Sequence, residues 1–155
     1  MSQLSQIFCT IRKDWVAALP EELVRQRVLS YMIENKGFPS SLIAVEIPLR
    51  QLPHLTPKDV SLVPDRRADI ICFANGTSGL YPLLLVECKA IKLSSRVVSQ
   101  VVGYNHFVRS RFVAIINQTE LRVGWYDEVK GEYLFINHLP EYGDLLKAVI
   151  APDNA

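Results

Sequence analysis

Two strand-like runs, RADIICF at residues 67–73 and PLLLVECKA at residues 82–90, constrain the fold of this chain more than any other feature. Both runs are largely apolar and contain residues that favour strands. The segment between them includes Asn75-Gly76-Thr77-Ser78-Gly79, in which asparagine and glycine favour a turn. The sequence therefore predicts a β-hairpin whose connecting loop is longer than two residues.

Helix and strand patterns alternate along the rest of the chain. Residues 20–35, PEELVRQRVLSYMIEN, predict a helix, because Pro20 and two glutamates suit its first turn and Gly37 suits its C-terminal end. We expect Ser94 or Ser95 to cap a second helix. The other expected elements are strands at 42–49, 111–117, 121–128 and 132–138, helices at 96–110 and 142–150, and a proline-containing loop at 51–64. This order predicts an α/β (α+β) fold in which helices flank a mixed central sheet.

Charged residues near the ends of the predicted hairpin strands form the candidate site. Side chains alternate between the two faces of a strand, so Glu87 and Lys89 are expected on the same side. Pairing of the strands would bring Asp69 close to Glu87. Two carboxylates so placed would bind Mg²⁺ through oxygen, and the ion would polarise a phosphoryl oxygen and generate hydroxide from bound water. Lys89 would orient that water or offset charge that develops on the phosphate.

The same residues also fit a purely structural role in which they catalyse no reaction. Acid-x-Lys triplets are common on solvated strand faces, where Glu87 and Lys89 would form a structural salt bridge. Arg66 and Arg67 are candidates for contact with a phosphate, and ion pairing with Asp65 is an equal alternative. From the residues alone, phosphodiester chemistry and a salt bridge both stay open.

Length and composition limit the class of protein. The chain has 155 residues, of which 49% are hydrophobic and 21% charged, so we expect one folded domain over residues 1–155. No apolar run reaches about 18 residues and the N-terminal residues lack a signal-peptide pattern, so we expect no membrane span and a cytoplasmic location. Cys9, Cys72 and Cys88 match no zinc pattern and are expected to be buried, reduced thiols.

Four segments, in this order, resemble one known family: PEELVRQRVLSYMIENKGFPSSLIAVEIPL, RRADIICF, LLLVECKA and QVVGY. Together they look like the N-terminal nuclease domain of type I restriction enzyme R subunits, which belongs to the PD-(D/E)XK phosphodiesterase superfamily. The resemblance covers about residues 15–117, and the ordered set is more specific than any single motif. It implies a restriction-endonuclease-like PD-(D/E)XK core.

The resemblance also implies a metal-binding set. Asp69 matches the metal-binding aspartate of the family, and Glu87 and Lys89 match its E-x-K pair. Glu22 aligns with an acidic helix residue that helps to hold the metal ion in many members, with Glu21 as the alternative. The backbone carbonyl of Cys88 is implied as a further ligand. The implied cofactor is Mg²⁺, with Mn²⁺ as a substitute.

The resemblance also implies roles for residues near this metal-binding set. Gln100 and Tyr104 match the Q-x-x-x-Y motif of these nuclease domains, and their i, i+4 spacing puts them on one helix face, from which they can reach the site or the DNA backbone. Arg25, one helical turn after Glu22, is expected to pair with a carboxylate of the site.

The function that the resemblance implies is a metal-dependent DNA endonuclease that hydrolyses phosphodiester bonds, in a restriction system or in other DNA processing. The chain contains no GxxxxGK[ST] phosphate loop. Three alternatives stay open: DNA cleavage together with a separate helicase or restriction–modification subunits, a free-standing nuclease, or a domesticated relative with another role. A homodimer would supply the surface that a duplex requires. The alternative is a catalytically silent nucleic-acid-binding or assembly module with the same fold, which would bind DNA in a salt-dependent manner without cleaving it.

Overall fold

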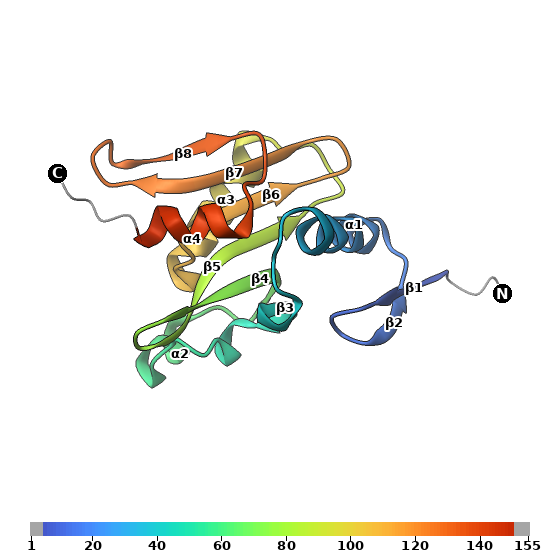
Figure 1. The fold of residues 1–155 in the computed structure, drawn as a ribbon, viewed down its shortest axis with the longest axis horizontal. Coiled ribbons are helices and arrows are strands. Elements are labelled where there is room, and N and C mark those ends of the chain that lie inside the picture. The colour runs from blue at the N-terminus through green and yellow to red at the C-terminus, as the bar shows by residue number, and fades with distance from the viewer. Residues whose placement is uncertain (1–4, 151–155) are drawn as a thin grey trace.

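A mixed six-stranded sheet is the central element of the computed structural model, which describes residues 5–150 (Figure 1). Its strands are β3 (Ile43–Pro48), β4 (Arg67–Gly76), β5 (Gly79–Cys88), β6 (Phe112–Ile116), β7 (Leu121–Asp127) and β8 (Glu132–Ile136). They lie in the sheet in chain order, and β5 and β6 are parallel whereas the other neighbours are antiparallel. The predicted mixed central sheet is confirmed.

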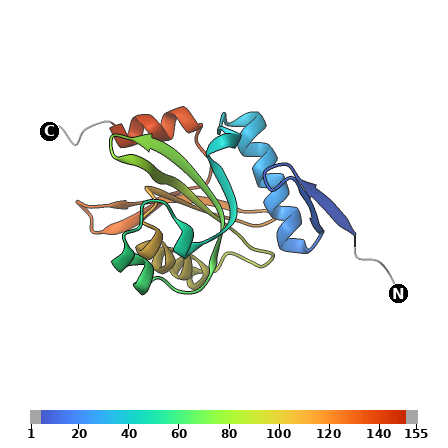
Figure 2. The same ribbon diagram turned by 90° about the horizontal axis from the view of Figure 1, so that it is seen from below.

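Helices cover both faces of this sheet (Figures 1 and 2). The three longer helices are α1 (Pro20–Asn35), α3 (Ser95–Val108) and α4 (Tyr142–Ile150). Val28 and Met32 of α1 share a buried core with Ile70 and with Leu145 of α4. Val101 of α3 belongs to a second core, which contains Ile71. Neighbouring residues of β4 thus contribute to opposite faces, as strand pleating requires, and α1 and α4 cover one face while α3 covers the other.

The parallel pair β5 and β6 requires a crossover connection, which α3 provides. The side chain of Ser94 caps α3 by accepting a hydrogen bond from the backbone nitrogen of Val97 at 3.3 Å, so Ser94 is the capping residue of the two that the sequence allowed. This connection brings α3 beside the C-terminal end of β5, where Glu87 and Lys89 lie.

The hairpin of β4 and β5 forms as predicted, but its connecting loop is shorter than expected. Gly76 pairs with Gly79, which leaves only Thr77 and Ser78 between the strands. The prediction of a longer loop was wrong because Asn75 and Gly76 continue the strand pairing instead of turning. Gly79 has a φ of +119°, a conformation in which a side chain would be strained.

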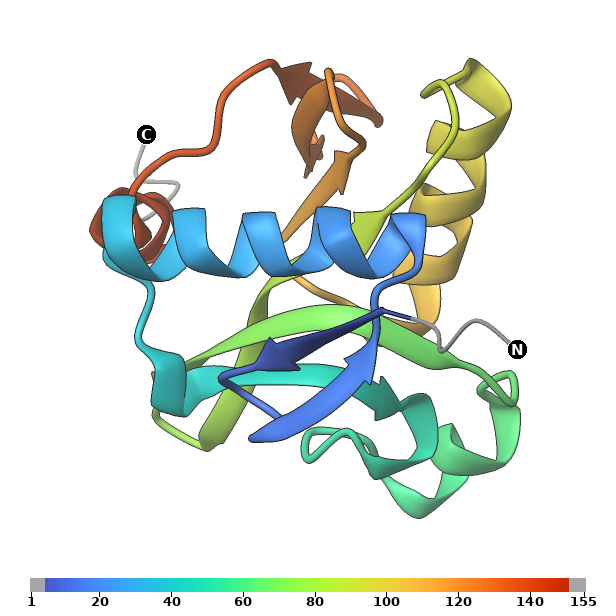
Figure 3. The ribbon, with the colours of Figure 1, turned by 90° about the vertical axis from the view of Figure 1, so that its right-hand side faces the viewer.

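Several short elements lie outside the predicted set. A separate two-stranded sheet is formed by β1 (Gln6–Cys9) and β2 (Asp14–Ala17), on the side of the molecule seen in Figure 3. The segment expected as a loop at 51–64 contains α2 (Pro57–Leu62), which Thr56 and Asp59 stabilise with a reciprocal capping box. Two short 3₁₀ helices, Ser40–Leu42 and Leu49–Gln51, flank β3.

The three cysteines are buried and unpaired, which confirms the prediction of reduced thiols. No helix within residues 5–150 combines the length and the apolar character that crossing a membrane would require.

Candidate functional site

The pairing of β4 with β5 brings two carboxylates together. Ile70 pairs with Val86, and the next residues outward along the two strands are Asp69 and Glu87. The Asp69 carboxylate accepts a hydrogen bond from the backbone nitrogen of Cys88 at 2.8 Å, which fixes its orientation against β5. The predicted proximity of Asp69 and Glu87 therefore follows from the register of the hairpin.

Glu87 is a buried acid beside another acid. Only 3% of its surface is exposed, and its Oε1 atom is buried without a hydrogen-bond partner. Burial, followed by the negative charge of Asp69, raises the pKa of Glu87 to about 8. Glu87 is ionised at neutral pH only if a cation offsets its charge.

Lys89 lies on the same side of β5 as Glu87. Its Nζ atom is 4.0 Å from Oε2 of Glu87, and a quarter of its side chain is exposed. The backbone nitrogen of Lys89 donates to the carbonyl oxygen of Ile116 at 2.8 Å, so pairing with β6 holds the end of β5 in place. The side chain of Glu87 is therefore buried, whereas that of Lys89 is partly exposed to solvent.

A cleft of about 460 Å³ opens next to these residues. It is lined by Pro64, Arg66, Glu87, Lys89, Gln100, Val101, Gly103, Tyr104 and Phe107. Five of the residues singled out in the sequence thus meet around one concavity, from β5, from α3 and from the segment before β4. The guanidinium of Arg66 lies 3.9 Å from the centre of the Tyr104 ring, within the range of a cation–π interaction.

Tyr104 contributes a polar atom to this cleft. Its hydroxyl group is buried without a hydrogen-bond partner, and burial together with the charge of Glu87 raises its pKa. Its ring belongs to the core between α3 and the sheet. Gln100, one turn earlier on α3, is exposed at the mouth of the cleft. The i, i+4 spacing therefore brings both side chains to the same cleft, as predicted.

Glu22 lies on the other side of Asp69, among basic residues. Its carboxylate accepts hydrogen bonds from Arg12, from Arg25 at 2.9 Å and from Gln26 at 3.1 Å. Burial alone would raise the pKa of Glu22, but these hydrogen bonds and the charges of both arginines lower it. Glu21 is exposed, whereas Glu22 is buried and contacts Arg25, which also contacts Asp69. Glu22 does not line the cleft.

Arg25 connects Glu22 with Asp69. One guanidinium nitrogen lies 2.9 Å from Oε1 of Glu22, and the other lies 2.9 Å from Oδ1 of Asp69. The expected pairing of Arg25 with a carboxylate of the site is confirmed. Arg67 lies farther out: its side chain is 65% exposed, and its nearest acidic partner is Glu46 at 3.9 Å.

Glu46 and Arg12 belong to this cluster but were not predicted. Glu46 lies between two β3 residues that pair with β4, and its φ of +52° departs from the strand conformation. Its carboxylate reaches Arg25 at 3.2 Å and Arg12 at 3.6 Å. A charged residue inside the apolar run LIAVEIPL was the only sequence signal for Glu46, and Arg12 gave none.

Glu87, which lines the cleft, and the neighbouring Asp69 fit a hard divalent ion. Among residues 5–150 no three His, Cys, Asp or Glu side chains form a ready-made metal-binding group. Asp69 and Glu87 nevertheless offer oxygen ligands, one of them buried and unpartnered, beside a solvent-connected cleft. Mg²⁺ is usually bound by one or two carboxylates, with water and substrate oxygens completing its shell. The donor set therefore suits such an ion.

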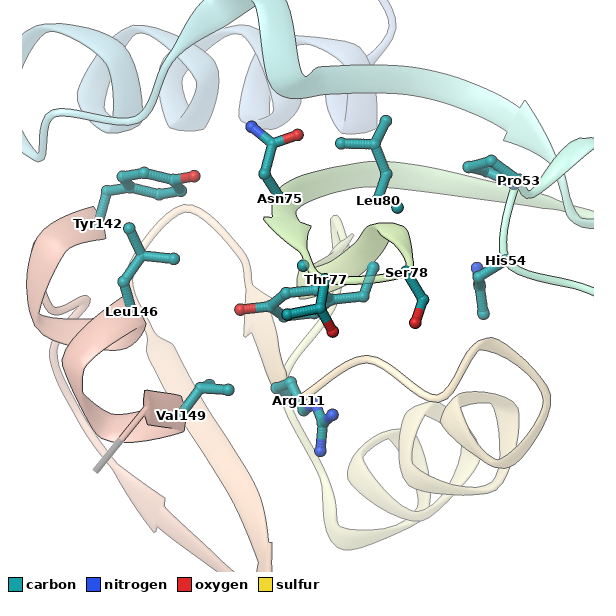
Figure 4. A pocket seen from close by; sticks show the side chains of 13 residues that line it. Pro53, His54, Asn75, Thr77, Ser78, Leu80, Arg111, Tyr142, Leu146 and Val149 are labelled. Carbon is teal, nitrogen blue, oxygen red and sulfur yellow. The ribbon is translucent and has the colours of Figure 1, made fainter. Parts of the chain in front are cut away.

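A larger concavity of about 1160 Å³ lies at the other end of the β4–β5 hairpin (Figure 4). His54, Thr77, Ser78, Arg111 and Tyr142 are among the residues that line it, but none of the lining residues is an aspartate or glutamate. It therefore lacks the ligands that a hard divalent ion requires, and the smaller cleft is the better candidate.

The family described as "Type I restriction enzyme R protein N terminus" has a model that matches residues 20–140, which include α1, the whole central sheet and every residue around the cleft. No curated protein and no solved structure gives a significant match.

Proposed function

The chain belongs to the family of type I restriction enzyme R protein N-terminal domains, and from this premise we propose that it is a Mg²⁺-dependent nuclease that hydrolyses DNA phosphodiester bonds. Membership of the family indicates a nuclease-like role in a restriction system. The finer proposal, metal-dependent cleavage at Asp69 and Glu87, rests on the geometry of the cleft.

The buried, unpartnered oxygen of Glu87 is the observation that carries this proposal. A carboxylate with 3% exposure and an acidic neighbour is costly unless a proton or a cation accompanies it. Lys89 lies 4.0 Å away and remains partly exposed, so it leaves this oxygen without a partner. A divalent ion between Asp69 and Glu87 would supply the missing charge.

Each residue around the cleft then has a defined task. Asp69 and Glu87 hold the ion, which when bound polarises a phosphoryl oxygen and lowers the pKa of a coordinated water. The ammonium group of Lys89 orients the attacking water and offsets negative charge on the phosphate. Arg66, held over the Tyr104 ring, contacts a backbone phosphate. Gln100 at the mouth of the cleft orients the substrate.

Glu22, Arg67 and Cys88 do not line the cleft. Glu22 is held by two arginines, and Arg67 points to Glu46 at the surface. We propose that Glu22 supports Asp69 through Arg25, while direct metal binding by Glu22 or by the Cys88 carbonyl stays a prediction. Arg67 is a further candidate for phosphate contact outside the cleft.

DNA and restriction–modification subunits are the proposed partners, since the family is part of type I restriction enzymes. We also propose that residues 1–155 form one domain, although residues 1–4 and 151–155 lie outside the described part of the chain. A homodimer or a separate helicase would add the surface that binding to a duplex requires.

One observation favours the alternative, a catalytically silent DNA-binding or assembly module. Oδ1 of Asp69 is already paired with Arg25, so a cation is present at one of its oxygens without any metal ion. Such a module would bind DNA with a strong dependence on salt and would not cut it.

Cleavage of supercoiled plasmid tests the two functions against each other. The wild type should convert plasmid to nicked or linear forms with Mg²⁺ or Mn²⁺ and not with EDTA. Asp69→Asn and Lys89→Ala should reduce the rate at least about 100-fold, a typical loss when a catalytic group is removed. Lys147→Ala, on the exposed side of α4, is the matched control and should cut normally. Plasmid binding without metal-dependent cutting by the wild type would favour the silent module.

A further inference from the structure

Arg25 is a buried cation at the centre of an acidic cluster. It is 5% exposed, and it projects from α1 towards β3 and β4. Its guanidinium contacts Glu22 and Asp69 at 2.9 Å and Glu46 at 3.2 Å. A single side chain therefore pairs with three carboxylates that come from three different elements.

Arg12 supplies a second guanidinium to the same cluster. From the turn between β1 and β2 it contacts Glu22 and, at 3.6 Å, Glu46. Three carboxylates thus face these two guanidiniums, and the exposed Arg67 adds a third guanidinium 3.9 Å from Glu46, so the negative charge on this side of Asp69 is already balanced. Glu87, on the other side, contacts neither arginine.

The backbone of β3 is bent to complete this arrangement. Glu46 adopts a φ of +52°, a left-handed conformation that is unfavourable for a residue with a side chain. Val45 and Ile47 on either side retain their pairing with β4, so the distortion is local to Glu46. With this backbone conformation, the carboxylate of Glu46 contacts both Arg12 and Arg25.

We propose that Arg25 occupies the place of a second metal ion, so that the site binds one divalent ion, held by Asp69 and Glu87 on the cleft side. This inference rests on the proposed metal-dependent function. Two-metal phosphodiesterases place a second ion about 3.5–4 Å from the first, on carboxylates shared between the two. Here the carboxylates available for a second ion are Glu22 and Glu46, and both are already paired with guanidiniums. Oδ1 of Asp69 is paired with Arg25 as well, whereas its Oδ2 accepts only the backbone N–H of Cys88 and keeps a lone pair for the first ion.

The charges of the cluster favour one ion over two. A second divalent ion would lie within contact distance of Arg25 and Arg12, in a buried setting where repulsion between like charges is weakly screened. One ion on the cleft side, in contrast, lies beside Glu87, whose Oε1 atom has no partner and whose nearest cation, Lys89, is 4.0 Å away. Arg25 is then a positioning residue: it holds Asp69 in place and fills the position of the second ion.

The number of bound Mn²⁺ ions per chain tests this inference without measuring cleavage. Free Mn²⁺ is quantified by electron paramagnetic resonance during titration of the wild type, Arg25→Lys and Arg25→Met, with circular dichroism to verify folding. The wild type and Arg25→Lys should bind one ion each, because both keep a cation among the three carboxylates. Arg25→Met removes that cation and should bind two. Arg122→Met, on an exposed position of β7, is the matched control and should bind one.

The outcomes separate the inference from the function on which it rests. Two ions in the wild type would overturn the inference and leave a metal-dependent nuclease intact. One ion in a folded Arg25→Met variant would overturn the role of Arg25. Wild type that binds no Mn²⁺ would contradict the proposed function itself. If Arg25→Met does not fold, Arg25→Gln, which removes the cation but keeps a polar side chain among the three carboxylates, should bind two ions, and one ion in that variant would likewise overturn the role of Arg25.

Discussion

Glu87 is more deeply buried than Glu22, Glu46 or Asp69, and unlike them it lacks an arginine partner. Burial and the charge of Asp69 raise its pKa from 4.5 to about 8. Without metal, the folded protein therefore keeps a proton on Glu87 to a higher pH than the unfolded chain does. The stability that results is fully present below about pH 4.5 and is lost as the pH rises through about 8.

Glu87→Gln should remove this pH dependence, because an amide does not titrate. Without metal, the free energy of unfolding of the wild type should fall relative to that of Glu87→Gln between pH 5 and pH 8, by roughly 3 kcal/mol. Urea unfolding of both proteins across this pH range, in the presence of EDTA, measures the difference. Glu132→Gln, at an exposed position of β8, is the control, and its free energy of unfolding should change with pH as that of the wild type does.

Parallel curves for the wild type and Glu87→Gln would show that Glu87 titrates alike in the folded and unfolded states. The role of Glu87 as a buried ligand that needs a cation would then be wrong.

At this scale the sequence predicted the residues whose positions follow from strand alternation. Glu87 and Lys89 are two residues apart on one strand, and Asp69 follows from the pairing of that strand with its neighbour. Glu46 could not be predicted as part of the cluster, because regular alternation fails at its positive φ. Arg12 reaches the cluster only through the turn of a hairpin that the sequence analysis did not detect.

Among the elements, the last hairpin of the sheet depends on Gly124. A Cβ atom at this position of β7 would lie 2.5 Å from the ring of Phe135 and 3.0 Å from the carbonyl oxygen of Leu134 on β8. Gly124→Ala should therefore push β8 away from β7 and destabilise the protein by about 1–3 kcal/mol, as overpacking usually does. Thermal or urea unfolding measures the change.

Gly143 in α4 is the matched control, since a Cβ atom there would meet nothing within 4 Å. Gly143→Ala should leave stability unchanged or raise it by up to about 1 kcal/mol, because alanine favours a helix. A Gly124→Ala variant as stable as the wild type would contradict the close packing of β7 against β8.

The elements that the sequence predicted are those with clear periodicity or clear end signals. The helix at 20–35 was predicted with its observed bounds, and each strand of the central sheet with small differences at its ends. β1 and β2 were missed because they are only four residues long and their outward residues, Phe8 and Trp15, are exposed apolar side chains. α2 was missed because three prolines obscured the capping box at Thr56.

At the scale of the whole molecule, the site lies where two layers of helices and the sheet meet. α1 brings the arginine cluster to one side of Asp69, and α3 brings Gln100 and Tyr104 to the cleft on the other side. Motif spacing predicted that Gln100 and Tyr104 would share one face of α3 and reach the site or the DNA backbone. It did not predict that Glu22 and the cleft would lie on opposite sides of Asp69, because this depends on how α1 packs on the sheet.

In the proposed site, Asp69 and Glu87 hold a divalent ion beside the cleft. A crystal structure of the protein soaked in Mn²⁺, with data collected at the manganese absorption edge, tests it most directly. We expect one anomalous peak, about 2.0–2.3 Å from an oxygen of each carboxylate, typical of carboxylate ligation of divalent ions. No peak between Asp69 and Glu87 at saturating Mn²⁺, or a peak only among Glu22 and Glu46, would contradict it.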